Sequence, residues 1–575
     1  MRILFLTHSF NSLTQRLYVE LARDGHEVSI EFDVNDATSE EAVALYRPDV
    51  IVAPFLKRAI PESIWGRHLC LVVHPGPPGD RGPSALDWAI QEGASEWGVT
   101  VLQADGEFDA GPVWAGAAFP MREAKKSSLY RNEVTDAAAR AVREALARLE
   151  GGGFRPQRLA AGDARVRARP LMRQPDRAID WSRDATAAVL RKIRAADSFP
   201  GVPDTLFGEA FRLYGAHAEP RIAGTRPGEV IAQRDGAILR ATVDGAVWIT
   251  HLKRHAGAEP AFKLPAALAL GELARGIPHA DAGPVLAAPG DGWREITYEE
   301  RNGVGYLAFD FYNGAMGTEH CQRLHAAIEA ASRRPVDVLV LLGGEDFWSN
   351  GIHLSLIEAA PSPADASWEN INAIDDVARA ILTNERQLTI SALRGNAGAG
   401  GVFLALAADR VLARSGVVLN PHYKGMGNLY GSEYWTYSLP RRVGWEQARA
   451  ITRNRLPLDA SAALAAGVVD QALDGDLARF ACQVAAYAER LAADPGLPAL
   501  LAAKRARRAE EERVKPLARY REEELERMRL NFYGFDPSYH VARYNFVHKV
   551  AHSWTPRHLA LHRRLDFAPG RERAA

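Results

Sequence analysis

The chain has 575 residues, with 70 Lys plus Arg against 71 Asp plus Glu and a formal net charge of −1. This length exceeds a single hydrophobic core, so roughly two to four domains are expected, and the charge balance gives no field that favours nucleic acid or a membrane surface. The widely spaced Cys70, Cys321 and Cys482 match no metal or redox pattern, and no apolar stretch reaches the roughly 20 residues that span a bilayer, so we expect no metal site and a cytoplasmic protein.

The first 120 residues alternate short apolar runs with helical patterns. The predicted strands are residues 3–6, 27–32, 50–54 and 71–73, and the predicted helices between them are 14–23 and 40–46. This alternation favours a parallel sheet covered by helices. A further helix over 125–150 ends in the glycine run 151–153, which is typical of a boundary or a flexible connection. We therefore expect an α/β domain over residues 1–165.

A histidine follows the fourth predicted strand. Strand 71–73 delivers His74 to its carboxyl end, where open α/β sheets bind their ligands. The Pro- and Gly-rich loop 75–79 lets a ligand approach the backbone, and a second loop, 106–111, carries Asp109. A carboxylate beside an imidazole keeps it charged and oriented, which suits proton transfer in acyl chemistry. The plainer alternative is that His74 ends a strand and Asp109 caps a turn.

The pattern changes after residue 165. A predicted helix over 184–195 is followed by short strands near 210–215, 228–232, 237–241 and 246–250. This pattern predicts a small β-rich domain over residues 166–270. Residues 271–292, which contain three prolines, read as a linker.

Strand–helix alternation returns in residues 293–500, which we interpret as another α/β domain. The buried strand 336–342 is followed by Ser-Asn-Gly-Ile at 349–352, and the glycine-rich run 395–401 precedes an apolar helix. Glycines at a helix N-terminus expose backbone N–H groups, and two such groups from separate loops can hold one thioester carbonyl oxygen. Alternatively, the run 395–401 is only a tight packing turn.

The remaining residues, 501–575, are predicted to be helical and charged. The densest runs of charge are 504–513 and 521–529. Such runs usually form solvated helix faces, and we interpret both in that way.

Several motifs of the first half resemble the 10-formyltetrahydrofolate transferases and hydrolases, which include methionyl-tRNA formyltransferases. They are His74-Pro75, Arg81-Gly82, an apolar helix with Trp88-Ala89-Ile90, and Asp109-Ala110-Gly111-Pro112. The resemblance implies 10-formyltetrahydrofolate as the formyl donor, His74 and Asp109 as catalytic residues, and Arg81 and Gly82 as binding residues. Residues 170–215 resemble the C-terminal barrel of the methionyl-tRNA enzymes.

One position departs from the family's motif, and one further residue is a candidate for substrate binding. The family has an Asn two residues before the His, and Val72 stands there instead, which cannot donate to an oxyanion. This departure argues against an ordinary tRNA or purine formyltransferase. Arg131 is a candidate for binding a CoA phosphate or the folate glutamate; the alternative is a plain surface arginine.

The order of motifs from about 293 to 490 resembles the crotonase (enoyl-CoA hydratase/isomerase) superfamily. The resemblance implies a coenzyme A thioester with its oxygen held by the N–H groups of Ile352 and Gly400, beside Gly351 and Gly401. Both hydratase glutamates are absent, since their positions fall on Phe403 and Tyr423. Water addition needs paired carboxylates, so hydratase activity is not expected.

Tyr423 and Glu433 remain as candidate acid and base, and the sequence leaves their order open. A carboxylate in the aromatic and glycine-rich surroundings of residues 429–435 would have a raised pKa, which suits a proton acceptor near neutrality. Alternatively, Glu433 is an ordinary solvated loop carboxylate.

The combination of the two halves resembles the HypX/HoxX hydrogenase maturation proteins over almost the whole chain. That resemblance implies formyl transfer from 10-formyltetrahydrofolate to coenzyme A, then breakdown of formyl-CoA to carbon monoxide for the iron of [NiFe]-hydrogenase. The implied partners are small molecules and hydrogenase iron-centre assembly proteins, with no nucleic acid or membrane. Two rivals stay open: a formyltransferase acting on an amino-sugar nucleotide or another amine, and a non-catalytic CoA-binding scaffold for hydrogenase assembly.

Overall fold

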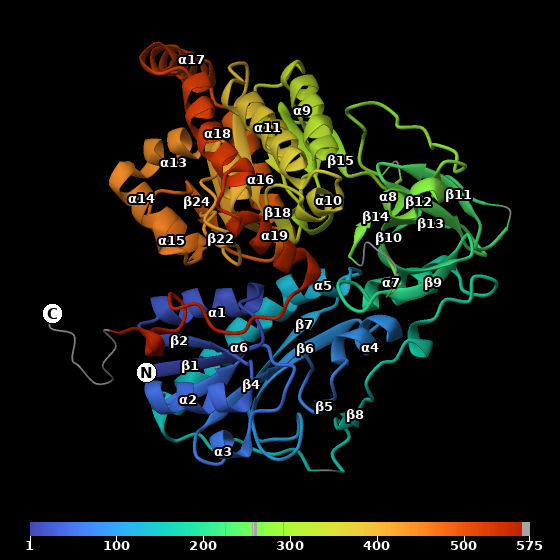
Figure 1. The fold of residues 1–575 in the computed structure, drawn as a ribbon, viewed down its shortest axis with the longest axis vertical. Coiled ribbons are helices and arrows are strands. Elements are labelled where there is room, and N and C mark those ends of the chain that lie inside the picture. Colours follow the sequence, from blue (N-terminus) through green and yellow to red (C-terminus); the bar gives the residue numbers. More distant parts are fainter. Residues whose placement is uncertain (161, 225, 256, 258–261, 291, 566–575) are drawn as a thin grey trace. The chain divides into compact units, whose positions relative to one another are not determined.

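The structure is a computed structural model that describes residues 1–565 except 161, 225, 256, 258–261 and 291. The chain divides into two compact units. Unit 1 consists of residues 1–179, 191–202 and the C-terminal segment from 551, and unit 2 consists of residues 180–190 and 203–550. Figure 1 shows the elements of both. No helix in the described part of the chain is both long and apolar enough to cross a membrane.

Unit 1 is built on a six-stranded sheet with the order β2-β1-β3-β4-β6-β7. The strands are β1 (Arg2–Thr7), β2 (Glu27–Phe32), β3 (Val50–Ala53), β4 (Cys70–His74), β6 (Glu96–Gln103) and β7 (Val113–Pro120). The first four are parallel, as expected, whereas β6 and β7 run antiparallel and make the sheet mixed. The strand β6, which follows the helix α4 (Ala85–Glu92), was not among the predicted strands.

Helices cover both faces of this sheet (Figure 1). On one face, α2 (Asp36–Tyr46) and α3 (Glu62–Trp65) pack on alternate strand residues such as Leu4 and Leu6. On the other face lie α1 (Ser12–Arg23) and α6 (Thr135–Gly151), which contact each other. Successive side chains of a strand point to opposite faces of the sheet. Because helices cover both faces, the side chains on both must be apolar.

The edge strand β2 is covered by the far end of the chain. The Ile30 N–H donates to the Leu559 carbonyl at 3.1 Å, and the Phe32 N–H donates to Thr555 Oγ1 at 2.7 Å. The carboxylate of Glu31, which is fully buried, lies 2.8 Å from His562 Nε2 and 2.7 Å from Arg563 Nε. The C-terminal segment therefore protects strand groups that an open edge would expose.

Unit 2 begins with a β-rich part whose strand order is β11-β12-β13-β10-β9. The strands are β9 (Val202–Leu206), β10 (Glu209–Glu219), β11 (Val230–Arg234), β12 (Ala237–Ala241) and β13 (Ala246–Arg254). The helix before them, α7 (Thr186–Ala195), crosses the boundary between the units. Beyond them, residues 278–280, in the predicted linker, pair with Gln233 of β11.

The rest of unit 2 contains two sheets. The larger has the order β15 (Ile296–Arg301), β16 (Val304–Phe309), β17 (Val338–Leu342), β19 (Leu388–Leu393), β21 (Arg410–Arg414), β24 (Gln471–Leu473). The smaller has the order β18 (Phe347–Ser349), β20 (Asn396–Gly398), β22 (Val418–Asn420), β23 (Leu458–Asp459). Each of β17, β19 and β21 is followed by a strand of the smaller sheet, so the loops after β18, β20 and β22 emerge side by side.

Helices pack around these two sheets. The main ones are α9 (Thr318–Ser332), α11 (Pro363–Leu382), α12 (Gly400–Leu406), α13 (Trp435–Val443), α16 (Leu477–Ala492), α17 (Leu497–Val514), α18 (Leu517–Tyr533) and α19 (Ser538–His548). Figure 1 shows α18 alongside α11. The interpretation of residues 504–513 and 521–529 as solvated faces is wrong at Lys504, Arg508 and Glu524, which are buried.

Candidate active sites

The first candidate site lies at the carboxyl end of β4 in unit 1. His74 is buried between two carboxylates: its Nε2 lies 3.0 Å from Asp80 Oδ2, and its Nδ1 lies 3.4 Å from Asp109 Oδ1. Asp109 also accepts a hydrogen bond from the Gly82 N–H at 3.1 Å. The structure thus brings together the predicted residues His74, Asp109 and Gly82, and adds Asp80, which was not predicted.

The two carboxylates set the charge of His74. Burial alone would lower its pKa, but the hydrogen bonds and charges of Asp109 and Asp80 outweigh burial and raise the pKa of His74 to about 9. Burial would likewise raise the pKa of Asp109, but its contacts with His74 and with the Gly82 N–H lower it. At neutral pH the site therefore holds a charged imidazolium between the carboxyl groups of Asp80 and Asp109.

The loop after β4 has little room for side chains. A Cβ on Gly76 would lie 2.5 Å from both His74 Nε2 and Asp80 Oδ2, so only glycine leaves this ion pair intact. Val72 shares a strand face with His74 and packs towards α2 and α3, so it supplies no polar group there.

The remaining predicted residues of unit 1 have other partners. Arg81 Nη1 lies 3.0 Å from Glu107 Oε1. Arg131 lies in the π-helical turn Tyr130–Val134 and donates to the Ser127 carbonyl at 3.3 Å. Single π turns inside helices often mark functional positions, but no contact described for Arg131 joins it to His74.

The second candidate site lies in unit 2, where the loop after β18 meets the N-terminus of α12. A Cβ on Gly351 would lie 3.5 Å from the Gly400 nitrogen, which places the two predicted loops against each other. Among the described residues, neither the Ile352 nor the Gly400 N–H group has a hydrogen-bond acceptor. Gly401 also packs tightly against the first loop, since a Cβ at this position would lie 2.0 Å from the Ser349 carbonyl oxygen. Two unused donors are therefore available at one place.

Glu433 lies directly against this pair of loops. A Cβ on Gly400 would lie 2.0 Å from Glu433 Oε1, so the carboxyl group occupies the space that a larger residue at position 400 would fill. Glu433 is 1 % exposed, as its apolar surroundings in the sequence suggested. Burial and the charge of Asp375 raise the pKa of Glu433 to about 8. A carboxyl group of this kind changes charge near neutrality.

Tyr423 is the immediate partner of Glu433. Its hydroxyl donates to Glu433 Oε2 at 2.5 Å and lies 3.0 Å from the Ser432 carbonyl, so one proton has two acceptors. Burial and the charge of Glu433 raise the pKa of Tyr423 well above its usual range. The Tyr423 ring stacks on Phe403 with centroids 5.2 Å apart, so the two positions at which hydratase glutamates were expected meet in one apolar contact.

Two buried carboxylates behind Glu433 were not recognised in the sequence. Asp375 on α11 and Glu524 on α18 are both fully buried, and both contact the turn that carries Glu433. The signal for Asp375 was an acidic residue on the apolar face of a helix, between Ile371 and Ala378. Glu524 lies inside a charged run and left no such signal.

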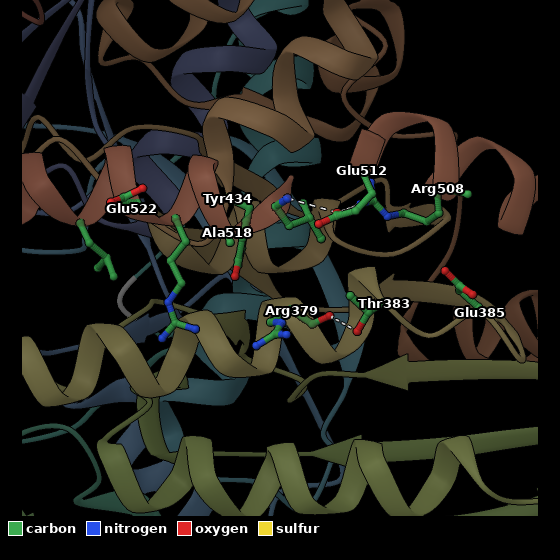
Figure 2. A pocket seen from close by; sticks show the side chains of 12 residues that line it. Arg379, Thr383, Glu385, Tyr434, Arg508, Glu512, Ala518 and Glu522 are labelled. Atoms are coloured by element: carbon green, nitrogen blue, oxygen red, sulfur yellow. Dashed lines mark hydrogen bonds and ion pairs between the residues drawn. The ribbon is translucent and has the colours of Figure 1, made fainter. Parts of the chain in front are cut away.

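A pocket of about 540 Å³ lies next to this turn, at Tyr434. Figure 2 shows Tyr434, Arg379, Arg508 and Glu512 around it. Its twelve lining residues include neither Glu433 nor Gly400. The pocket is therefore lined by Tyr434, the residue after Glu433, but not by Glu433 itself.

Comparison with known proteins identifies the family. The hydrogenase maturation factor HoxX of Bradyrhizobium diazoefficiens is 58 % identical over 571 residues, which cover 99 % of each chain. The chain belongs to the HypX/HoxX hydrogenase maturation family. Crystal structures of HypX from Aquifex aeolicus agree with this: one has a TM-score of 0.95 and 49 % identity, covering 99 % of this chain and 100 % of that one. Another HypX crystal structure of equal similarity is a complex with tetrahydrofolic acid.

The composite nature of this chain is visible in its matches to three family models. They are "Formyl transferase" over residues 4–146, "Formyl transferase, C-terminal domain" over 171–262, and "Enoyl-CoA hydratase/isomerase" over 299–555. A methionyl-tRNA formyltransferase of Ralstonia nicotianae is 29 % identical over 42 % of this chain and 72 % of its own length. These matches confirm the predicted combination of a formyltransferase fold with a crotonase-like fold.

Proposed function

We propose that this protein makes carbon monoxide for [NiFe]-hydrogenase maturation from the formyl group of 10-formyltetrahydrofolate. Coenzyme A accepts the formyl group at the His74 site of unit 1. The resulting formyl thioester is then broken down in unit 2. The observation that carries the proposal is the Tyr423–Glu433 pair beside the N–H groups of Ile352 and Gly400, which are predicted to hold the thioester oxygen. This pair supplies an acid and a base next to Gly400, although the two positions at which the resemblance expects hydratase glutamates carry Phe403 and Tyr423.

The first step is acyl transfer at His74. The thiol sulfur of coenzyme A attacks the formyl carbon, the bond from that carbon to the folate nitrogen breaks, and the thiol proton ends on that nitrogen. A charged His74 stabilises the negative charge that develops on the formyl oxygen. Asp109 and Asp80 hold the imidazolium in place, and Asp109 is the group nearest His74 Nδ1 for moving the proton. Arg81, Gly82 and Arg131 are proposed to bind the substrates.

The second step is decarbonylation. The formyl proton passes to Glu433, the C–H electron pair stays on carbon, and the C–S bond breaks with its electrons on sulfur. Tyr423 protonates the sulfur and regains a proton from Glu433, so carbon monoxide and the free thiol are the only products. The N–H groups of Ile352 and Gly400 would hold the thioester oxygen during this step. Phe403 keeps the pair in apolar surroundings, which favours proton transfer over hydrolysis.

Support for folate as the formyl donor comes from the family. An Aquifex aeolicus HypX that is 49 % identical to this chain was crystallised with tetrahydrofolic acid, and residues 4–146 match a formyl transferase family. Coenzyme A as acceptor rests on the enoyl-CoA hydratase/isomerase match and on the two unused N–H donors. Hydrogenase iron-centre assembly proteins are the proposed users of the carbon monoxide.

One assay tests both steps. The protein is mixed with 10-formyltetrahydrofolate and coenzyme A, and carbon monoxide is detected by its binding to reduced haemoglobin. The expected result is carbon monoxide that requires all three components. Formation of formate or a formylated amine instead would favour the amine-formyltransferase alternative. Unchanged 10-formyltetrahydrofolate with bound coenzyme A would favour the scaffold alternative.

A further inference from the structure

The turn that carries Glu433 has an unusual backbone. Glu433 and Tyr434 are consecutive residues with left-handed conformations, φ 59° and φ 57°, and neither is glycine. Such conformations are rare for side chains of this size and persist only where surrounding contacts hold them. In this conformation Glu433 lies against Gly400, and Tyr434 lines the neighbouring pocket (Figure 2).

Asp375 holds the first half of this turn. One of its oxygens accepts a hydrogen bond from the Glu433 N–H at 2.8 Å, and the Ser432 hydroxyl lies 2.7 Å from both of its oxygens. These contacts fix the backbone of the residue whose side chain faces the thioester site. Because Asp375 is fully buried, water does not replace them.

Glu524 holds the second half. Its Oε2 accepts from the Tyr434 N–H at 3.0 Å, and its Oε1 accepts from the Thr436 N–H at 2.8 Å and from the Thr436 hydroxyl. These N–H groups lie at the start of α13 and have no acceptor within their own helix, which is why a carboxylate suits them. One helical turn earlier, Arg521 lies 3.7 Å from Asp375 and 2.6 Å from Asp376, joining α18 to α11.

We propose that Asp375 and Glu524 are positioning residues. They hold the Ser432–Thr436 turn in its left-handed form and so keep the Glu433 carboxyl group next to Gly400 in the predicted thioester site. Asp375 has a second effect, because its negative charge disfavours the charged form of Glu433. The inference rests on the proposed function, since it assigns Glu433 the role of proton acceptor.

Several charged or titratable groups surround Glu433 from different elements. In the part of the chain that the structure describes they are mainly acids or neutral groups, and the cation Arg521 is paired with Asp375. They are Tyr423, Cys321 on α9, Asp375 and Asp376 on α11, and Arg521 and Glu524 on α18. Asp375 is the acid whose charge acts most strongly on Glu433. A change of Asp375 to Asn removes that charge but keeps an oxygen that accepts from the Glu433 N–H.

The decisive measurement is the titration of Glu433 in the full-length protein. Infrared difference spectra follow the C=O stretch of its protonated carboxyl, which is identified by its loss in Glu433→Gln. In Asp375→Asn the midpoint is expected to fall by about 1 pH unit or more. Asp376→Asn is the matched control, since Asp376 is half-exposed and contacts Arg521 but not the turn; its midpoint should move less. An unchanged midpoint in Asp375→Asn would overturn the proposal.

A kinetic measurement tests the positioning role. Glu524→Gln should lower kcat for carbon monoxide release from formyl-CoA by about 100-fold, because a small misplacement of a catalytic group has effects of that size. The KM should stay close to wild type, since the N–H donors are retained. Glu522→Gln, two residues away on an exposed position, should behave as wild type.

Other outcomes separate the two proposals. If the Glu524→Gln chain melts near the wild-type temperature and keeps its kcat, Glu524 does not position Glu433. If Asp375→Asn only lowers kcat at every pH and leaves the pH midpoint in place, Asp375 is merely structural. If wild-type protein releases no carbon monoxide, the proposed function fails, while the infrared titration still decides whether Asp375 controls Glu433.

Discussion

Tyr423 and Glu433 form a hydrogen bond of 2.5 Å inside unit 2, with both side chains almost completely removed from solvent. We expect Tyr423→Phe and Glu433→Gln each to lower carbon monoxide release by about 100-fold or more, because each removes one partner in the proton transfer. Formation of the formyl thioester should continue in both variants and the thioester should accumulate, which chromatography of quenched reactions measures. Tyr487→Phe on α16 serves as the control; similar losses there would contradict the assignment.

The pH dependence of carbon monoxide release should follow Glu433. Burial and the charge of Asp375 raise the pKa of this carboxyl group to about 8, and only its charged form can take a proton. The rate of formyl-CoA breakdown is therefore expected to rise with pH through about 8. A rate that is flat between pH 6 and 9 would show that Glu433 is not the proton acceptor.

Formyl transfer should have the opposite pH dependence. The pKa of His74 is raised to about 9, so the imidazolium is present at neutral pH and is lost above that value. Asp80→Asn removes one of the two charges that favour the imidazolium, and its falling limb should lie at lower pH than that of wild type. The measurement is the consumption of 10-formyltetrahydrofolate against pH; a falling limb at the wild-type pH would rule out this effect of Asp80.

The buried acids behind Glu433 should make unit 2 less stable as pH rises. Burial raises the pKa of Asp375 to about 6, above its value in the unfolded chain, so its contribution is fully present below about pH 4 and is lost as pH rises through 6. The loss is on the order of 3 kcal/mol. Thermal unfolding between pH 5 and 8 should show this slope in wild type and a smaller slope in Asp375→Asn.

The Glu31–His562 contact should stabilise unit 1. Replacing His562 with Ala leaves a buried carboxylate with fewer partners, and we expect a loss of about 3 kcal/mol. Although burial opposes it, hydrogen bonds from His562, Thr555 and Arg563 lower the pKa of Glu31, so this stabilisation is present at neutral pH and is lost in acid. Arg557→Ala, on an exposed residue of the same segment, is the control in a denaturant titration.

Much of the fold could be predicted from the sequence because apolar periodicity and glycine placement are local signals. The strand before His74, the turn at Gly351 and the helix after Gly400 were all found in this way. Asp80, Asp375 and Glu524 were not recognised as site residues because their contacts are non-local or depend on how loops close. Glu524 lies 90 residues from Tyr434 along the chain, and no pattern within α18 distinguishes it from its solvated neighbours.

The C-terminal cover over β2 also orders events during synthesis. The Ser29 hydroxyl meets His562 across 533 positions of sequence, and all of unit 2 is translated between them. At the usual speed of a ribosome this takes roughly half a minute to two minutes. During that interval β2 remains an uncovered sheet edge and Glu31 lacks its partners. The formyltransferase-like unit is therefore begun first and finished last, and a chain that stops early leaves it incomplete.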